Sequence, residues 1–473
     1  MNIGRKDLFW GYAASSMRIL SGLLIMPVSL RLLSADEQGI WQIYLATIGI
    51  ITILDFGFGS SFTRNVTYVF SGVKDLKTTG YEAAENSDMD YGLLKSLLKA
   101  MRTYYCIMAL VFFAIFAFVS PFYIPHVLKD YSGNHQTVWI TWFIFGLTLT
   151  YELYTYYYNA ILVGCGKVKQ NMQITVISQL VRIVLTVVLL LLGFKLYALV
   201  IGVFIADLIN RMLSYKSFYD KKIKTQLAKS VITKPIKETM EILAPNSIKL
   251  GFTLLGNFLR SKTIVYITPF FLPLSVIASY GITMQITTMI YQLGGTWFST
   301  FYPQISQYTV QERNDDVKRM YIKALLFLVI IYVVLSAGFM LFGQGILVFF
   351  KSQTSLLSHP YMFVILLFSL LDMNLAINTA MLTARNEVPF YKSYIIAGVL
   401  TVLFTWLMFK FTSLGVWSLI LSGGLAMSIY IFWKWPLKVI KDLNVSWKDV
   451  AQTINALWNE IIELFRKKIK KLF

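Results

Sequence analysis

The chain has little of what soluble and secreted proteins rely on. Its 473 residues include only two cysteines and three histidines, and only 14% of the residues are charged. Soluble domains average about 25% charged residues, so the composition excludes an ordinary soluble globular protein. Cys106 and Cys165 are too few for a disulfide framework. The scattered histidines His126, His135 and His359 do not predict a metal site, and we expect no bound metal.

Motifs of catalysis are also absent from the sequence. It has no P-loop lysine motif for ATP hydrolysis and no Gly-x-Ser-x-Gly nucleophile turn. The longest loop expected on the side opposite the termini covers only residues 124–136, which is short for a polymerase or ligase site. We therefore expect a protein that is not an enzyme and has no cofactor. If it transports a substrate, an H⁺ or Na⁺ gradient, the membrane potential or the substrate flux must drive it.

Apolar residues dominate instead. They make up 56% of the chain, and the mean hydropathy is +0.62. A helix needs about 20 apolar residues to cross a bilayer. Enough such segments are present to predict an all-helical polytopic membrane protein with about twelve transmembrane helices. The segments are residues 8–33, 39–62, 101–123, 137–163, 172–193, 197–216, 242–270, 275–301, 321–350, 360–384, 392–411 and 415–436.

The net charge of +19 is distributed unevenly between the two sides of these segments. Of the 43 lysines and arginines, 32 fall on the side of the termini and 5 on the other side. Lysine and arginine accumulate in cytoplasmic loops, so both termini are predicted to be cytoplasmic. The excess positive charge then reflects membrane orientation and attraction to anionic lipid headgroups, and does not indicate nucleic acid binding.

A cationic pattern occurs twice in the chain, each time within an apolar segment. The same spacing separates an arginine, a proline and a glycine in both copies, at a constant offset of 242 residues. The two sets are Arg18, Pro27 and Gly39, and Arg260, Pro269 and Gly281. An arginine within a membrane helix costs roughly 2.5–3.5 kcal/mol on insertion scales, so a repeated one indicates a function. The pattern predicts two equivalent halves around a shared cationic interior.

The repeat continues at a second offset. The loop after the second segment is about 22 residues longer than its counterpart, so the offset should fall to 220. At that offset Glu152 matches Asp372. We therefore predict two pseudo-symmetric six-helix lobes, 1–216 and 242–436, joined by a basic cytoplasmic linker, 217–241.

The remaining residues, 437–473, are predicted to form a basic amphipathic tail helix. Apolar residues recur at helical spacing from Trp447 onward, and Ser446 followed by Asp449 is a plausible helix start. The other face ends in five lysines and arginines. The tail is expected to lie on the cytoplasmic leaflet, with binding of a partner helix as the alternative.

Cations inside the predicted spans are candidate ligands for an anionic substrate group. Arginine binds a phosphate through two hydrogen bonds, and lysine acts as a point charge. The alternative is a structural ion pair or a side chain that reaches the interface. The candidates are Arg18, Arg182, Lys249, Arg260 and Lys262. Arg211, four residues after Asp207, is more simply explained by a local pair.

Acids inside the spans are candidates for ion coupling. An intramembrane carboxyl group can exchange a proton or bind a cation. Glu152 and Asp372 are the strongest candidates because they occupy matching repeat positions, and Asp207 is a third. Charge balance for the arginines is the alternative explanation.

Local motifs are similar to those of a known family. Residues 33–41 resemble an acidic-x-Gly-aromatic turn between the first two helices. The other motif residues are Asp55, Gly57, Gly59 and Arg64 at the end of the second segment, and Gly164 and Gly166 after the fourth. In this order they resemble the polysaccharide-transporter branch of the multidrug/oligosaccharidyl-lipid/polysaccharide (MOP) exporter superfamily. The turn at 384–387 lacks both glycines, so the motif does not extend to it.

The resemblance implies a MATE-like fold and a lipid-linked oligosaccharide flippase of the Wzx type. Such a protein moves undecaprenyl-pyrophosphate-linked repeat units across the bacterial inner membrane for O-antigen, capsule or exopolysaccharide synthesis. Implied partners are this lipid, membrane lipids and the polysaccharide polymerase machinery. The alternative is an ion-coupled multidrug or metabolite exporter of the same superfamily, although internal lysines and arginines would repel organic cations. A non-transporting scaffold is disfavoured by the cost of so many internal charges.

Overall fold

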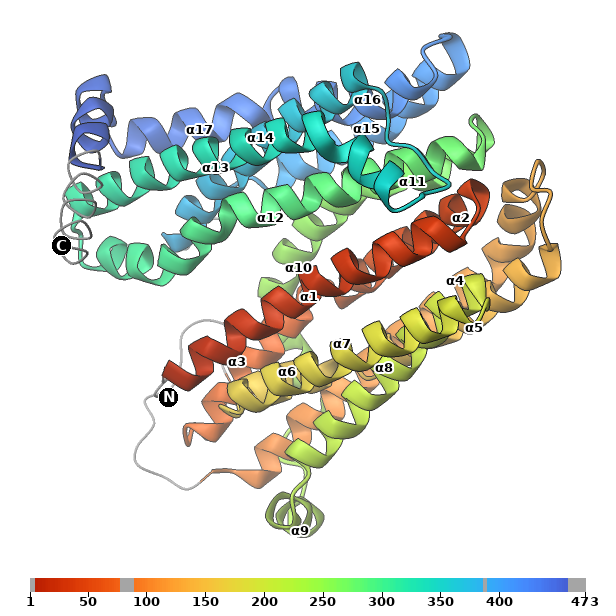
Figure 1. The fold of residues 1–473 in the computed structure, drawn as a ribbon. Helices are drawn as coiled ribbons and strands as arrows, with labels where there is room; N and C mark the ends of the chain where they lie inside the picture. Colours follow the sequence, from red (N-terminus) through yellow and green to blue (C-terminus); the bar gives the residue numbers. More distant parts are fainter. Residues whose placement is uncertain (1–4, 77–88, 386–388, 458–473) are drawn as a thin grey trace, which may run out of the picture.

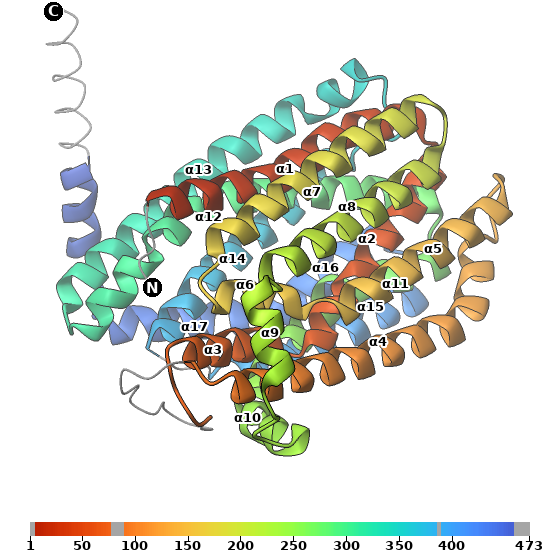
Figure 2. The ribbon, with the colours of Figure 1, turned by 90° about the horizontal axis from the view of Figure 1, so that it is seen from below.

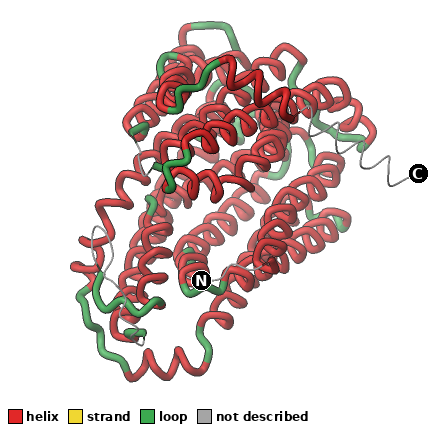
Figure 3. Tube along the Cα trace, turned by 90° about the vertical axis from the view of Figure 1, so that its left-hand side faces the viewer, coloured by secondary structure: helices red, strands yellow, loops and turns green. Residues whose placement is uncertain are grey.

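The computed structural model describes residues 5–76, 89–385 and 389–457. These residues form helices and loops, with no strand among them (Figure 3). Helices α1–α8 and α10–α17 form two bundles, which we call the N-terminal and C-terminal halves (Figure 1). Helix α1 begins at the end of the molecule where α17 ends, and we call the opposite end the distal end (Figure 1).

The N-terminal half contains six spans, two of which are broken into two helices. Its helices are α1 (Arg5–Leu32), α2 (Ala35–Asp55), α3 (Phe58–Phe70), α4 (Tyr91–Val127), α5 (His135–Tyr154), α6 (Tyr157–Gly164), α7 (Val168–Leu191) and α8 (Lys195–Phe218). A short helix, α9 (Lys221–Lys229), follows α8 and precedes the C-terminal half.

The C-terminal half also contains six spans, of which the first and the last are broken. Its helices are α10 (Ile236–Ser261), α11 (Thr263–Ile267), the 3₁₀ helix η1 (Thr268–Phe270), α12 (Leu274–Val310), α13 (Asn314–Phe349), α14 (His359–Ala384), α15 (Tyr391–Phe411), α16 (Val416–Ser428) and α17 (Ile431–Asp442). A further helix covers residues 447–457 and begins where Ser446 and Asp449 cap each other's backbone, as predicted.

Each of the twelve predicted spans coincides with a helix or a broken run of helices, so the chain is an all-helical multi-pass membrane protein. By length and composition, seven helices of the described part are apolar enough to cross a membrane, or eight if the bent pair α2 and α3 is one span. The long helices that miss this threshold include α10 and α12, which are rich in polar residues. Polar helices are expected where a membrane protein lines its own interior.

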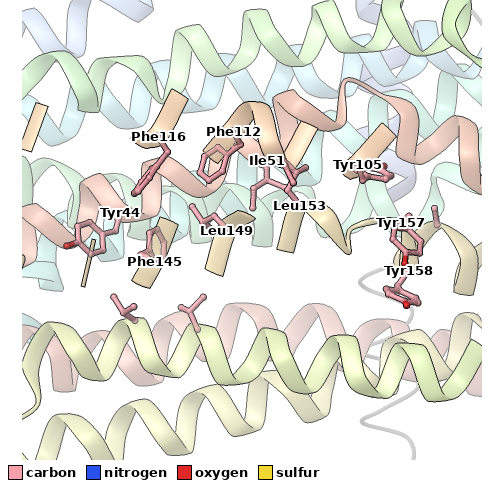
Figure 4. Packing of buried hydrophobic residues seen from close by; sticks show 14 of the residues in the cluster. Tyr44, Ile51, Tyr105, Phe112, Phe116, Phe145, Leu149, Leu153, Tyr157 and Tyr158 are labelled. Carbon is pink, nitrogen blue, oxygen red and sulfur yellow. The ribbon is translucent and has the colours of Figure 1, made fainter. Parts of the chain in front are cut away.

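The core of the N-terminal half is built from aromatic rings (Figure 4). Tyr44 of α2 stacks on Phe145 of α5 with ring centroids 5.2 Å apart. Its buried hydroxyl donates a hydrogen bond to the carbonyl oxygen of Val138 at 3.0 Å. Phe116 of α4 stacks on Trp142 at 4.9 Å. Because a buried hydroxyl without a partner is costly, the hydrogen bond from Tyr44 to Val138 fixes α2 against α5 in one register.

The break between α2 and α3 is a sharp turn centred on Asp55. Phe56 and Gly57 both have positive φ angles, 47° and 75°, and the two helices meet at 51°. The Asp55 carboxylate accepts hydrogen bonds from the Gly59 amide at 3.0 Å and from the Tyr105 hydroxyl at 2.5 Å. Asp55 therefore caps α3 and ties the bend to α4.

At the distal end, α2 and α12 touch through the two glycines of the repeat. A Cβ atom on Gly39 would lie 2.2 Å from the backbone oxygen of Leu274, and one on Gly281 would lie 2.2 Å from the side chain of Gln42. Only glycine permits this approach. The Gly39 and Gly281 match therefore corresponds to a contact between the halves.

A loop of the C-terminal half adds a second contact at the distal end. Gln353 donates a backbone hydrogen bond to the carbonyl oxygen of Leu30 at 2.9 Å and a side-chain bond to that of Arg31 at 3.2 Å. Both acceptors belong to the last turn of α1, whose carbonyls have no partner within the helix. The halves are thus joined at the distal end.

Helix α10 passes between the two halves (Figure 1). Near its start, Leu243 lies in the core of the N-terminal half, and the Ser247 hydroxyl donates to that of Ser61 at 2.8 Å. Near its end, a Cβ on Gly256 would lie 2.5 Å from the backbone of Tyr394 in α15. Any motion between the halves must therefore move α10 relative to one of them.

Candidate functional site

A pocket of about 720 Å³ lies inside the C-terminal half. Its walls come from α10, α11, α12, α14, α15, α16 and α17. Volumes of this size hold small-molecule ligands or parts of larger ones. Four tyrosines line it together with Arg260 and Asp372; they are Tyr280, Tyr291, Tyr302 and Tyr394. Aromatic walls with one charged pair suit a ligand that has both apolar or sugar surfaces and a charged group.

Arg260 and Asp372 form an ion pair across this cavity. The Nη1 atom of Arg260 donates to Oδ2 of Asp372 at 2.5 Å, and Nη2 donates to Oδ1 of Asn257 at 2.8 Å. The two charged side chains are 19% and 25% exposed, so both can be reached from the cavity. The Nε atom of Arg260 is buried and makes no hydrogen bond to the described residues. The guanidinium therefore retains donor capacity while its charge is balanced.

A second group of charges lies in the N-terminal half, on α5, α7 and α8. Glu152 interacts electrostatically with Asp207, Arg182 and Arg211. The group contains two acids and two bases, so it is close to neutral. Arg211 is only 5% exposed, yet its Nε and Nη1 atoms have no hydrogen-bond partner among the described residues, and the same holds for Oδ2 of Asp207. Asp207 and Arg211 therefore lie near each other without the hydrogen bond that a local ion pair between them would form.

Arg182 also borders the contact between the halves. It lines a pocket of about 50 Å³ whose other walls are parts of α1, α2 and α12, including Gln38 and Gln285. Arg182 therefore faces the interface, whereas Arg260 faces the cavity of the C-terminal half. The structure places these two candidate phosphate ligands in different pockets.

The three remaining candidate cations lie on α1, on α10 and directly after α10. Lys262 is exposed at the break between α10 and α11, and its aliphatic stem packs near Gly49 of α2. Arg18 lies in α1 and Lys249 in α10, but their side chains are outside the described part of the structure. Their predicted contact with substrate remains a prediction.

The glycines of the family-like motifs lie at turns and close contacts. A Cβ on Gly164 would meet Val66 of α3 at 2.6 Å, and Gly166 has a φ angle of 82° at the turn into α7. Arg64 is exposed on α3. Among the described residues, no cluster of histidine, cysteine or carboxylate side chains could hold a metal ion.

Two contributors to these sites were not anticipated from the sequence. Asn257 lies one turn before Arg260, so its position alone could have indicated the contact. Tyr105 reaches Asp55 from a different helix, α4, and no local signal indicates that contact.

No protein-family model matches this sequence, and no curated protein matches it significantly. Solved structures do share its fold. An inward-facing multidrug resistance MATE transporter of the MOP superfamily matches 90% of this chain and 95% of its own, with 13% identity and a TM-score of 0.62. The lipid II flippase MurJ in an inward closed conformation matches 98% and 93%, with 13% identity and a TM-score of 0.62. A MATE crystal structure in complex with MaD3S matches 91% and 94%, with 15% identity and a TM-score of 0.51. The chain thus has the fold of these MATE and MurJ structures.

Proposed function

We propose that this protein is a flippase for undecaprenyl-pyrophosphate-linked oligosaccharides. It would carry them from the cytoplasmic to the opposite leaflet of the bacterial inner membrane for surface polysaccharide synthesis, with both of its own termini in the cytoplasm. The observation that carries the proposal is the Arg260 guanidinium in the wall of the tyrosine-lined cavity of about 720 Å³. Guanidinium groups recognise phosphate oxygens, and aromatic walls suit sugar rings. The fold shared with a lipid II flippase supports the same class of substrate.

The Arg260–Asp372 pair offers a coupling step. Pyrophosphate oxygens compete with the Asp372 carboxylate for the same guanidinium. When the substrate binds Arg260, Asp372 loses its cation and becomes a site for H⁺ or Na⁺, because an uncompensated charge in a partly buried cavity is costly. Binding of the anionic substrate then raises the affinity for the cation, and binding of the cation raises the affinity for the substrate by the same factor. Glu152 and Asp207 would act similarly beside Arg182 in the N-terminal half.

A multidrug exporter of the same fold is the second candidate, favoured by the likeness to MATE transporters. Its usual cationic substrates would need a free carboxylate in the cavity. Asp372 is already occupied by Arg260, which makes an anionic substrate the better fit.

Reconstituted full-length protein tests the proposal. Proteoliposomes would carry a fluorescent undecaprenyl-pyrophosphate disaccharide, and a membrane-impermeant reductant would report the fraction in each leaflet. We expect rapid exchange with the wild type, loss with Arg260→Ala and partial activity with Arg260→Lys. Arg319→Ala, which removes an exposed arginine of α13, is the matched control. No exchange by the wild type, with export of cationic dyes instead, would establish the second candidate.

A further inference from the structure

A lateral groove lies between α4 of the N-terminal half and the α11–η1 segment of the C-terminal half. Figure 2 shows α4 and α13 at opposite edges of the molecule, and the groove is on the α4 side. It has a volume of about 480 Å³ and walls that include Phe112, Trp142 and Phe270. Ile115 and Val119 on its rim are 56% and 45% exposed. Because these helices lie at membrane depth, the groove opens toward lipid chains and can take up hydrocarbon.

A polar pocket of about 490 Å³ adjoins the groove at the distal end. Phe270 lines both spaces, and the His126 ring stacks on it with centroids 4.2 Å apart. The charged residues of the polar pocket are Lys129, Asp130 and Asp36. An apolar space thus leads into a polar one at the level where α4 ends and α12 begins.

Three hydroxyl groups in the walls of the groove are buried and have no hydrogen-bond partner among the described residues. They belong to Tyr123, Thr263 and Tyr266. Tyr123 lies one turn before His126 and therefore near the junction of the two spaces. A buried hydroxyl without a partner is unfavourable by about 1–3 kcal/mol. The ester oxygens of a glycerolipid, which lie between its chains and its headgroup, are suitable acceptors.

We infer that this seam binds a phospholipid with a zwitterionic phosphate–ammonium headgroup, such as phosphatidylethanolamine. The acyl chain would occupy the groove, and the phosphate would lie near Lys129 and His126. The ammonium group would lie near Asp36 and Asp130. A pyrophosphate or an anionic lipid would meet two carboxylates in the same pocket and be repelled. The inference is therefore independent of the flippase proposal.

Binding here has a conformational consequence. The walls come from both halves, so a lipid in the seam stabilises the arrangement in which α4 and η1 are together. Separation of the halves at the distal end would have to break the lipid's contacts with one of them.

Native mass spectrometry of the full-length protein tests the inference. The purified protein would be titrated with dioleoyl phosphatidylethanolamine and, separately, dioleoyl phosphatidylglycerol. We expect at least threefold higher occupancy of one tight site by phosphatidylethanolamine, and loss of this preference with Lys129→Ala. Val119→Trp should fill the groove and reduce occupancy, whereas Val329→Trp, at an equally exposed position on α13, should not.

Three outcomes would overturn the inference. They are equal occupancy by both lipids, equal effects of the two tryptophan variants, and displacement of phosphatidylethanolamine by an undecaprenyl-pyrophosphate lipid. The last would assign the groove to the transported substrate. The leaflet-exchange assay gives a separate result, because lipid occupancy is measured without transport.

Discussion

Each half carries an acid on its fourth span, and the two halves balance its charge differently. In the C-terminal half, Asp372 of α14 pairs with Arg260 of α10, the first helix of that half. In the N-terminal half, Glu152 of α5 belongs to a group on α7 and α8 that includes Asp207 and Arg182. Each acid lies on the fourth span of its half, and its counter-charge comes from different helices. Both groups reach the contact between the halves, the C-terminal pair through α10, which also packs on α3 and α4, and the N-terminal group through Arg182, which lines a pocket with α12.

The largest expected effect is at the C-terminal pair. Arg260→Ala leaves the Asp372 carboxylate without its cation, and we expect transport to be abolished. Loss of one partner of a fully buried pair costs roughly 3–5 kcal/mol, and the partial exposure of both side chains should reduce this figure. Thermal unfolding in detergent and leaflet exchange would measure the two effects.

A double variant separates charge balance from substrate binding. Arg260→Ala with Asp372→Ala removes both charges and should recover most of the stability but none of the transport. If it restored transport, Arg260 would serve only to neutralise Asp372, and the coupling step would be rejected.

The second effect concerns the repeated glycines. Gly39→Ala would place a Cβ against the backbone of Leu274, which cannot move alone, whereas Gly281→Ala would meet the flexible side chain of Gln42. We expect Gly39→Ala to cost roughly 1–3 kcal/mol and to separate α2 from α12, and Gly281→Ala to cost less. Thermal unfolding and labelling of a cysteine placed near the distal end would show the difference. Equal costs would mean that the contact is symmetric.

A smaller effect is expected in the N-terminal half. Glu152→Gln leaves one acid and two arginines in the group, so its net charge becomes positive. We expect tighter binding of the anionic substrate and slower turnover, with a lower KM and a lower kcat. An unchanged KM would place Glu152 outside the substrate path. The isosteric Asp207→Asn variant is the matched comparison.

The helices could be predicted from the sequence more completely than the site. The length of each apolar segment located the span, but this length covers only the part of the helix that lies inside the bilayer. Helix α4 begins at Tyr91, ten residues before the predicted span, because Leu93, Leu94 and Leu97 form a buried stripe beyond the membrane. The predicted repeat selected Glu152 and Asp372 as candidates. Their different partners depend on which helices adjoin α5 and α14, and no periodicity or spacing in the sequence contains that information.

The smallest expected effect compares the starts of α2 and α12. Helix α2 begins with a capping box in which Ser34 accepts from the Glu37 amide at 3.2 Å and Glu37 accepts from the Ser34 amide at 2.8 Å. Helix α12 begins at Leu274, and its N-cap residue, Pro273, offers no side-chain cap. Ser34→Ala should therefore destabilise the protein by about 1 kcal/mol. Pro273→Ala should destabilise it less, because it only increases the conformational entropy of the unfolded chain. Thermal unfolding of the two variants would test this order. A larger loss from Pro273→Ala would show that the rigid turn before α12, rather than the cap of α2, holds the distal contact in place.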